Sequence, residues 1–302
     1  MNVLSLSYGK DSLACLGACE QLGIKIDRIV HAEVWATDTI PADLPPMVEF
    51  KKHADKIIKK RYGIEVEHIC ALKAQGWAVA NEHTKASFIK RLKKGGTQEA
   101  STDSLQHSVL DAENSKWKQT VLTYEDMFYQ QCVKSPKIYG FPHGRSEWCK
   151  ILKRQVNMGS CDTFNQILGI AADEPKRIER HSKRDNVILP LVEIGWTEAI
   201  CREWCEQNDL LSPIYTTATR GGCWFCHNQS VDQLRLLRKN YPDLWALLLK
   251  WDKDSPVTFK PDGHTVHDFD RRFQAEDDGL IIAGDRKFRW SQIDGEVQIK
   301  FF

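Results

Sequence analysis

The sequence contains no apolar run that approaches the roughly 18 residues needed for a membrane-spanning helix. Its first seven residues also lack the basic segment, apolar stretch and small-residue cleavage site of a secretion signal. We therefore expect a soluble, cytoplasmic protein with no membrane partner.

Net charge is nearly absent as well, because 42 Lys and Arg residues are balanced by 41 Asp and Glu residues over a chain of 302 residues. This balance excludes a general attraction to nucleic acid, so any such contact must be local. Cysteine, in contrast, is plentiful. Without a secretion signal, the ten cysteines are predicted to be thiols, metal ligands or core residues rather than a disulfide framework.

Strand and helix patterns alternate along the first part of the chain. Residues 3–7 and 26–34 read as strands, residues 11–19 and 47–62 as helices, and residues 64–69 as a third strand. This alternation predicts an α/β fold with a doubly wound, mainly parallel sheet. The sheet domain is expected to span residues 1–210.

Two regions depart from the alternating pattern. A polar stretch with a basic cluster predicts an insertion at residues 84–135. Further strands are expected at residues 163–171 and 187–192, followed by a helix capped by Thr197. Residues 211–302 are expected to form a helical and loop cap that carries a Cys-x-x-Cys site.

The segment between the first predicted strand and helix has the composition of a phosphate site. A helix N-terminus there offers backbone N–H groups and the positive end of the helix dipole to an anion. Small, hydroxyl and charged side chains suit that role, and Asp11 could also help to hold Mg²⁺. The residues are Ser7, Tyr8, Gly9, Lys10, Asp11 and Ser12. They do not form a Walker motif, and a plain strand-to-helix turn capped by Asp or Ser is the alternative.

The cysteines fall into sets with different expected roles. Cys223 and Cys226 follow two glycines and are placed to share a metal ion or cluster. Cys201 and Cys205 lie four residues apart on one face of a predicted helix, which favours burial. Other cysteines among apolar neighbours, namely Cys15, Cys19 and Cys70, are predicted to pack as small hydrophobic residues.

Residues 7–12 resemble the Ser-Gly-Gly-x-Asp-Ser loop of the PP-loop (N-type ATP pyrophosphatase) superfamily. Four later segments are similar to those of its phosphoadenosine phosphosulfate (PAPS) reductase group: Asp38-Thr39, residues 147–153 with Cys149 and Lys153, residues 169–174, and Pro190-Leu191-Val192 with Trp196. The chain also departs from the family pattern, including Trp148-Cys149 where the adenylyl-sulfate reductases have a Cys-Cys pair. Tyr8 replaces the usual Gly, and no cysteine follows Cys226, whereas PAPS reductases use a nucleophilic cysteine near the chain end.

The resemblance implies an adenine nucleotide alpha hydrolase-like fold and a set of site residues. Asp38 and Thr39 would lie beside the nucleoside, and Asp173 and Arg177 would complete the nucleotide site formed by residues 7–12. Lys10, Asp11 and Lys153 would be the catalytic residues, acting on ATP with Mg²⁺.

The resemblance also implies a metal site. In iron–sulfur members, the segment matching residues 147–153 brings a cysteine beside the Cys-x-x-Cys turn, so a [4Fe–4S] cluster would be held by Cys149, Cys223 and Cys226. Cys161, Cys205 and His227 are candidates for the fourth ligand, and the sequence does not choose among them. Zn²⁺ held by Cys149, Cys223, Cys226 and His227 is one alternative, and a redox dithiol without metal is another.

These features predict ATP-dependent adenylation coupled to sulfur transfer, with a sulfur donor protein and a nucleic-acid or small-molecule acceptor. Reduction of a sulfonucleotide is the second hypothesis, although the missing tail cysteine counts against it. The third is an ATP-binding sensor or scaffold in a nucleic-acid modification or defence system, with a structural zinc site.

Overall fold

The computed structural model describes residues 1–73, 121–133, 139–144, 146–154, 164–216, 221–285 and 287–294. The chain forms two compact units that are each discontinuous in sequence. The first unit comprises Met1–Leu72, Val121–Tyr124 and Lys150–Cys223, and the second comprises Lys73–Thr120, Glu125–Cys149 and Trp224–Phe302. Of the predicted insertion, residues 84–120 and 134–135 lie outside the described residues, as does Cys161.

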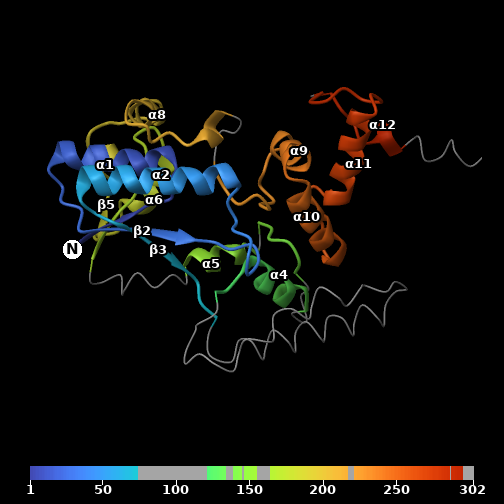
Figure 1. Cartoon of the computed structure of the whole chain (residues 1–302), viewed down its shortest axis with the longest axis horizontal. Helices are drawn as coiled ribbons and strands as arrows, with labels where there is room; N and C mark the ends of the chain where they lie inside the picture. The colour runs from blue at the N-terminus through green and yellow to red at the C-terminus, as the bar shows by residue number, and fades with distance from the viewer. Residues whose placement is uncertain are drawn as a thin grey trace, which may run out of the picture. The chain divides into compact units, whose positions relative to one another are not determined.

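The first unit contains a five-stranded sheet in which every pair of neighbours is parallel (Figure 1). Its strands are β1 (Asn2–Ser5), β2 (Arg28–Glu33), β3 (Val66–Cys70), β4 (Asn165–Ile167) and β5 (Val187–Ile188), in the order β3-β2-β1-β4-β5. The order runs outward from β1 in both directions, as in a doubly wound sheet. The predicted α/β class with a parallel sheet is therefore confirmed.

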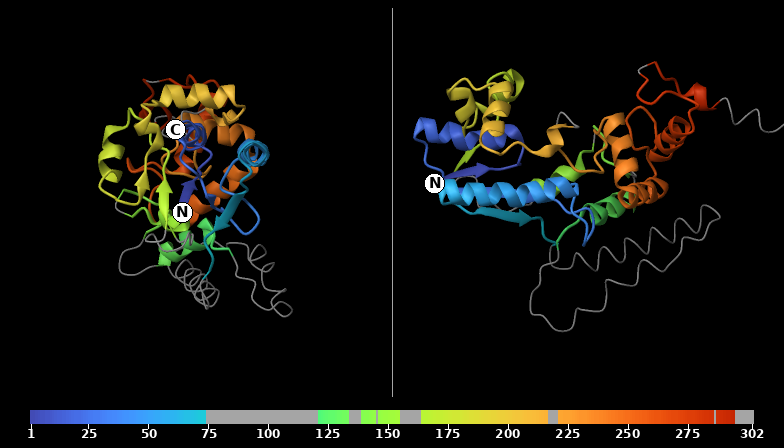
Figure 2. Two further views of the ribbon diagram at one scale, coloured as in Figure 1. Left: turned by 90° about the vertical axis from the view of Figure 1, so that its left-hand side faces the viewer. Right: turned by 45° about the horizontal axis from the view of Figure 1, so that its top comes forward.

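Helices flank this sheet (Figure 1, Figure 2). They are α1 (Lys10–Leu22), α2 (Pro45–Tyr62), α5 (Ile151–Arg154), α6 (Pro175–His181), α7 (Pro190–Glu193) and α8 (Glu198–Gln207), with a 3-10 turn η4 at Pro213–Thr216. The strand predicted at residues 187–192 is shorter than expected, because Pro190 occupies the first turn of α7. Proline at that position is preorganised for a helix and has no N–H to give to a ladder.

The main core of the first unit lies between the sheet and these helices. Leu4, Ile29 and Ile167 point from adjacent strands to the same face and pack against α1, α2, α7 and α8. Val3 and Val30, one residue away, point to the opposite face and form a smaller cluster with Phe164. This alternation follows from the two-residue period of a strand.

Four thiols belong to that core. Cys15 and Cys19 on α1, and Cys201 and Cys205 on α8, are at most 1% exposed. Burial raises the pKa of Cys19, Cys201 and Cys205 to about 12, so they stay protonated and behave as apolar groups. Their predicted packing role is confirmed, whereas Cys70 on β3 is half-buried.

The described part of the second unit is helical. Its elements are α4 (Tyr124–Val133) and the 3-10 turn η2 (Trp148–Lys150), whose terminal residues Tyr124 and Lys150 belong to the first unit, together with α9 (Val231–Asn240), α10 (Pro242–Asp254), α11 (Val266–Asp277) and α12 (Ser291–Asp294). Aromatic side chains form its interior. Trp224 stacks on Trp251 with ring centroids 5.6 Å apart, and Phe128 lies 5.3 Å from Phe141. Capping boxes at Ser230 and Thr265 define the starts of α9 and α11.

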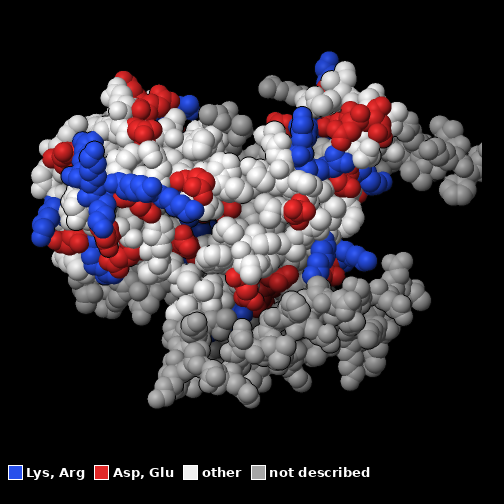
Figure 3. Space-filling model, in the orientation of Figure 1, with Lys and Arg blue, Asp and Glu red and all other residues white. Residues whose placement is uncertain are grey.

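Surface charges on the first unit are interleaved. Along α2, Lys52 pairs with Glu49, Lys59 with Glu65, and Arg61 with Glu20, and Figure 3 shows blue and red side chains next to each other over this region. This agrees with the near-zero net charge. None of the helices in the described ranges combines the length and apolar composition required to cross a membrane.

Candidate functional site

A cavity of about 640 Å³ opens at the carboxyl ends of β1, β2 and β4, lined by Ser5, Val30 and Gln166 among others. In a doubly wound sheet, the strand order reverses beside the first strand, here between β1 and β4, and ligands bind in the crevice at that point. The volume falls in the range of about 300–1,000 Å³ that is typical of small-molecule sites. All the residues that line the cavity belong to the first unit.

The predicted phosphate loop lies at this cavity. Ser7, Tyr8, Gly9, Asp11 and Ser12 all line it. The Ser7 hydroxyl donates to Ser12 Oγ at 3.0 Å, and Ser12 Oγ donates to the Gly9 carbonyl at 2.9 Å. These bonds brace the loop across the start of α1, where the first-turn N–H groups have no helical acceptors.

A close backbone contact joins this helix start to β4. A Cβ atom added to Gly169 would lie 2.6 Å from both Cα and N of Ser12. No larger residue fits there without moving the first turn of α1. Gly169 thus brings the end of β4 against the phosphate loop, which explains a glycine at the head of the segment 169–174.

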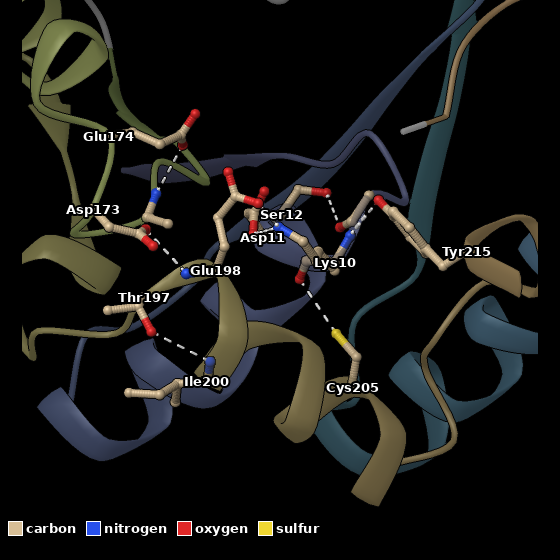
Figure 4. Close-up of polar contacts among 12 residues, drawn as sticks. Lys10, Asp11, Ser12, Asp173, Glu174, Thr197, Glu198, Ile200, Cys205 and Tyr215 are labelled. Carbon is tan, nitrogen blue, oxygen red and sulfur yellow. Dashed lines mark hydrogen bonds and ion pairs between the residues drawn. The ribbon is translucent and has the colours of Figure 1, made fainter. Parts of the chain in front are cut away.

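Lys10 and Asp11 form an ion-pair cluster with a helix from later in the chain. Lys10 Nζ lies 2.7 Å from Asp11 Oδ1 and 3.0 Å from Glu198 Oε2, and Figure 4 shows these side chains pointing toward one another. Burial alone would lower the pKa of Lys10, but the bonds to Asp11 and Glu198 outweigh it and raise that pKa. Burial raises the pKa of Asp11 despite the opposing charge of Lys10.

The backbone of Lys10 is held as well. Its N–H donates to the phenolic oxygen of Tyr215 at 3.1 Å, and its carbonyl accepts from Cys205 Sγ at 3.2 Å (Figure 4). Lys10 itself does not appear among the described residues that line the cavity. In this arrangement the Lys10 ammonium is paired with carboxylates, and Asp11 is the charged residue of the phosphate loop that lines the cavity.

Tyr8 takes the place that the resemblance assigns to glycine, and it adopts a positive φ of 55°. The backbone path expected of a glycine is therefore present despite the side chain. The ring is fully buried, and its hydroxyl donates to Asp55 on α2. Burial, reinforced by Asp55, raises the pKa of Tyr8 well above its ordinary value, so the phenol keeps its proton.

Cationic and thiol side chains complete the cavity wall. Lys153 on α5 and Arg177 on α6 both line it, and so does Cys223, which follows Gly221 and Gly222. Arg177 also contacts Glu174 at 2.6 Å. The structure thus brings two of the predicted cations and one of the predicted metal ligands to the same cavity as the phosphate loop.

Other predicted site residues lie elsewhere in the described part of the chain. Asp38 and Thr39 fall in a turn stabilised by Thr37 Oγ1, which accepts from Thr39 N at 3.4 Å and from Ile40 N at 3.1 Å. Asp173 Oδ1 accepts from Glu198 N at 3.0 Å (Figure 4), so it helps to cap α8. Neither Asp38, Thr39 nor Asp173 is among the residues lining the cavity.

The two residues between the paired cysteines have a clear structural role. Trp224 and Phe225 are 0% and 3% exposed, so within the second unit they anchor the chain that continues to Cys226. Lys260 Nζ donates to the His227 carbonyl at 2.6 Å. Burial lowers the pKa of Lys260, while the nearby Cys226 opposes that shift.

A metal site is not assembled by the described residues: among them, no three or more His, Cys, Asp or Glu side chains form a group able to hold a metal ion. Cys161, one candidate for the fourth ligand, lies outside them. Cys205, a further candidate, is buried between α8 and α1. The thiols of Cys149, Cys223 and Cys226 are all half-buried.

The residues of the site that were not predicted include Glu198, Tyr215 and Asp55. Glu198 had a signal, since it directly follows the predicted cap Thr197, whose Oγ1 accepts from Ile200 N (Figure 4). Tyr215 and Asp55 had none, because each acts through a contact with a residue far away in sequence.

Comparison with models of protein families, with characterised proteins and with solved structures finds no match to this chain. The functional argument therefore depends on the geometry of the fold and the cavity alone.

Proposed function

We propose that this chain binds an adenine nucleotide, ATP by preference, and cleaves it between the α and β phosphates to adenylate an acceptor. The observation that supports this most strongly is the cavity at the topological switch point, which residues 7–9, 11 and 12 line together with Lys153 and Arg177. A helix N-terminus with small and hydroxyl residues suits the phosphate chain, and the two cations suit its negative charge.

Each group has a distinct task in this proposal. The first turn of α1 and the Ser7 and Ser12 hydroxyls hold phosphate oxygens, and Lys153 and Arg177 offset charge that develops on pyrophosphate as it leaves. The Asp11 carboxyl and neighbouring hydroxyls are hard oxygen donors that suit Mg²⁺. When bound there, Mg²⁺ would supply charge neutralisation on the phosphates.

Transfer of sulfur to the adenylated acceptor is the extension that the resemblance predicts, with a sulfur donor protein as partner. The described residues do not assemble a metal centre, so no step of this proposal passes through a cluster. A second candidate function is reduction of a sulfonucleotide. It is favoured by one observation, which is that Cys223 lines the same cavity as Arg177.

Two measurements test the main proposal. They are the release of pyrophosphate from ATP in the presence of Mg²⁺ and the binding of ATP followed by calorimetry. Asp11→Ala should abolish release, because it removes the only carboxylate of the phosphate loop, residues 7–12. Asp185→Ala, at an exposed loop position, is the matched control and should retain activity. Full release by the Asp11 variant would sink the assignment.

The same assay separates the alternatives. Sulfite released from PAPS or its unphosphorylated analogue, without pyrophosphate from ATP, would identify a reductase. ATP binding without any cleavage would identify a sensor or scaffold.

The cysteine proposals are tested by metal content and absorption of protein purified without oxygen. About four irons with broad visible absorption would support a [4Fe–4S] cluster, and stoichiometric zinc without colour would support the structural site. Cys223→Ser and Cys226→Ser should each lower the bound metal, whereas Cys19→Ser, deep in the first unit, should not. Metal retained by both of the former variants would remove this pair from the site.

A further inference from the structure

Tyr8 has an unusual backbone for its residue type. Its φ of 55° is matched among non-glycine residues of the described chain only by Asp209, at 56°. The left-handed region costs an L residue roughly 1–2 kcal/mol, and it persists where the surroundings over-determine it. Whatever holds Tyr8 therefore also decides the path of the phosphate loop.

The Tyr8 side chain is held by residues from three elements of the first unit. Its hydroxyl donates to Asp55 Oδ1 on α2 and lies 3.1 Å from His68 Nε2 on β3. His68 in turn lies 2.9 Å from Asp55 Oδ2 and 3.0 Å from Glu33 Oε1 on β2. We refer to Tyr8, Asp55, His68 and Glu33 as the tyrosine anchor.

Charged hydrogen bonds hold the residues of this anchor together. Hydrogen bonds to Asp55 and Glu33 raise the pKa of His68 to about 9, so at neutral pH an imidazolium donates to a carboxylate on each side. The bond to His68 lowers the pKa of Glu33. The protonated phenol then supplies the remaining hydrogen to Asp55.

A second set of contacts holds the chain just before Tyr8. His31 Nδ1 donates to the Leu6 carbonyl at 2.8 Å, and Lys51 Nζ lies 2.7 Å from His31 Nε2. Burial, then the charge of Lys51, lowers the pKa of His31 to about 4, which leaves the ring neutral and able to accept from Lys51. Lys51 also pairs with Asp43 at 2.6 Å and lies 5.5 Å from the Tyr8 ring centroid.

We propose that Asp55, His68 and Glu33 are positioning residues that hold Tyr8 in its left-handed backbone and so aim Gly9 and the first turn of α1 at the phosphates of the nucleotide. A rotation about φ of Tyr8 would swing these following residues away from the cavity. Side-chain anchoring here does what glycine does by its own conformational freedom. The inference rests on the proposed nucleotide site and adds residues that do not contact the ligand.

Two substitutions at residue 8 separate backbone strain from side-chain loss. Tyr8→Ala removes the anchor but retains the cost of positive φ, whereas Tyr8→Gly removes both. ATP affinity measured by calorimetry should therefore be about 5- to 30-fold weaker for the alanine variant than for the glycine variant. Asp209→Gly, which relieves a positive φ away from the cavity, should bind ATP as wild type does. Equal affinities for the alanine and glycine variants would overturn the proposal.

Conservative changes in the anchor provide a second measurement. ATP binding by the wild type should weaken as the pH rises from 7.5 through the His68 pKa of about 9, because the imidazolium is lost. His68→Gln should bind more weakly than wild type at pH 7.5 and show no such decline. Wild-type affinity and an unchanged pH profile in His68→Gln would reject the role of the anchor.

Failure of the proposed function is distinguishable from failure of this inference. If the wild type binds no ATP, the nucleotide site itself is wrong. The thermal unfolding midpoints would then still test the anchor, since Tyr8→Gly should unfold at a higher temperature than Tyr8→Ala. Identical midpoints would contradict a strained backbone at residue 8.

Discussion

The phosphate loop is held in two different ways on its two sides. On the side of Tyr8, the fully buried tyrosine donates its hydroxyl to Asp55 on α2, and partly exposed bonds from His68 extend the contacts to β3 and β2. On the side of Lys10, they reach α8 through an ion pair in which the Glu198 side chain is 51% exposed. Exposed ion pairs are weak, at about 0–1 kcal/mol, whereas buried polar groups are expensive to leave unpaired. The contacts of Tyr8 therefore set the backbone shape of the loop, and the contacts of Lys10 set its charge.

The most sensitive point should be the one that both sides share, which is the start of α1 against Gly169. Gly169→Ala places a methyl group 2.6 Å from Ser12 backbone atoms, so we expect a loss of about 1–3 kcal/mol in the free energy of unfolding together with loss of ATP binding. Urea unfolding and calorimetry measure the two effects.

Gly17→Ala is the matched overpacking control, because its Cβ would lie 2.4 Å from the Trp204 ring on α8. It should destabilise the unit to a similar degree and leave ATP affinity intact. ATP binding retained by Gly169→Ala would show that the close approach does not shape the site.

A smaller change in the free energy of unfolding is expected from pH. The change has opposite signs for His68 and His31, the two histidines on the Tyr8 side. The pKa of His68 is raised from 6.5 to about 9, so its stabilising contribution is complete below pH 6.5 and is lost as the pH rises toward 9. The pKa of His31 is lowered from 6.5 to about 4. Its contribution is complete above pH 6.5 and is lost as the pH falls toward 4.

Urea unfolding between pH 4 and 9.5 checks both contributions. His68→Gln should flatten the alkaline decline in the free energy of unfolding and leave the acid side unchanged, and His31→Gln should do the reverse. A variant that altered both sides equally would show that the two histidines do not titrate separately.

The smallest effect should come from the Lys10 side. Glu198→Gln removes one carboxylate partner of Lys10 but keeps the helix and the bond from Lys10 to Asp11. We expect a change of about 0.2–1 kcal/mol in the free energy of unfolding and a gain of at most about fivefold in ATP affinity, since a negative charge is removed. A change as large as that of Gly169→Ala would reverse the ranking of the two sides.

Local patterns predicted much of the fold. Residues 3–7 alternate between apolar and polar and are followed by a glycine and an apolar helix pattern. This pattern predicted β1, the loop and α1, because strand and helix periods are properties of adjacent residues. The same reasoning overextended the strand at residues 187–192, where Pro190 begins α7. The buried roles of Cys201 and Cys205 also followed from spacing alone.

The chain order of residue types was sufficient for the α/β class and for the place of the loop between a strand and a helix, because both depend on short-range periodicity and on the chemistry of helix starts. Tertiary structure decided which charges face the cavity. Lys10 turns to Glu198, 188 residues away, Tyr8 turns to Asp55, 47 residues away, and Gly169 meets Ser12. Such partners are chosen by the packing of whole elements, and that choice is not encoded in any local window.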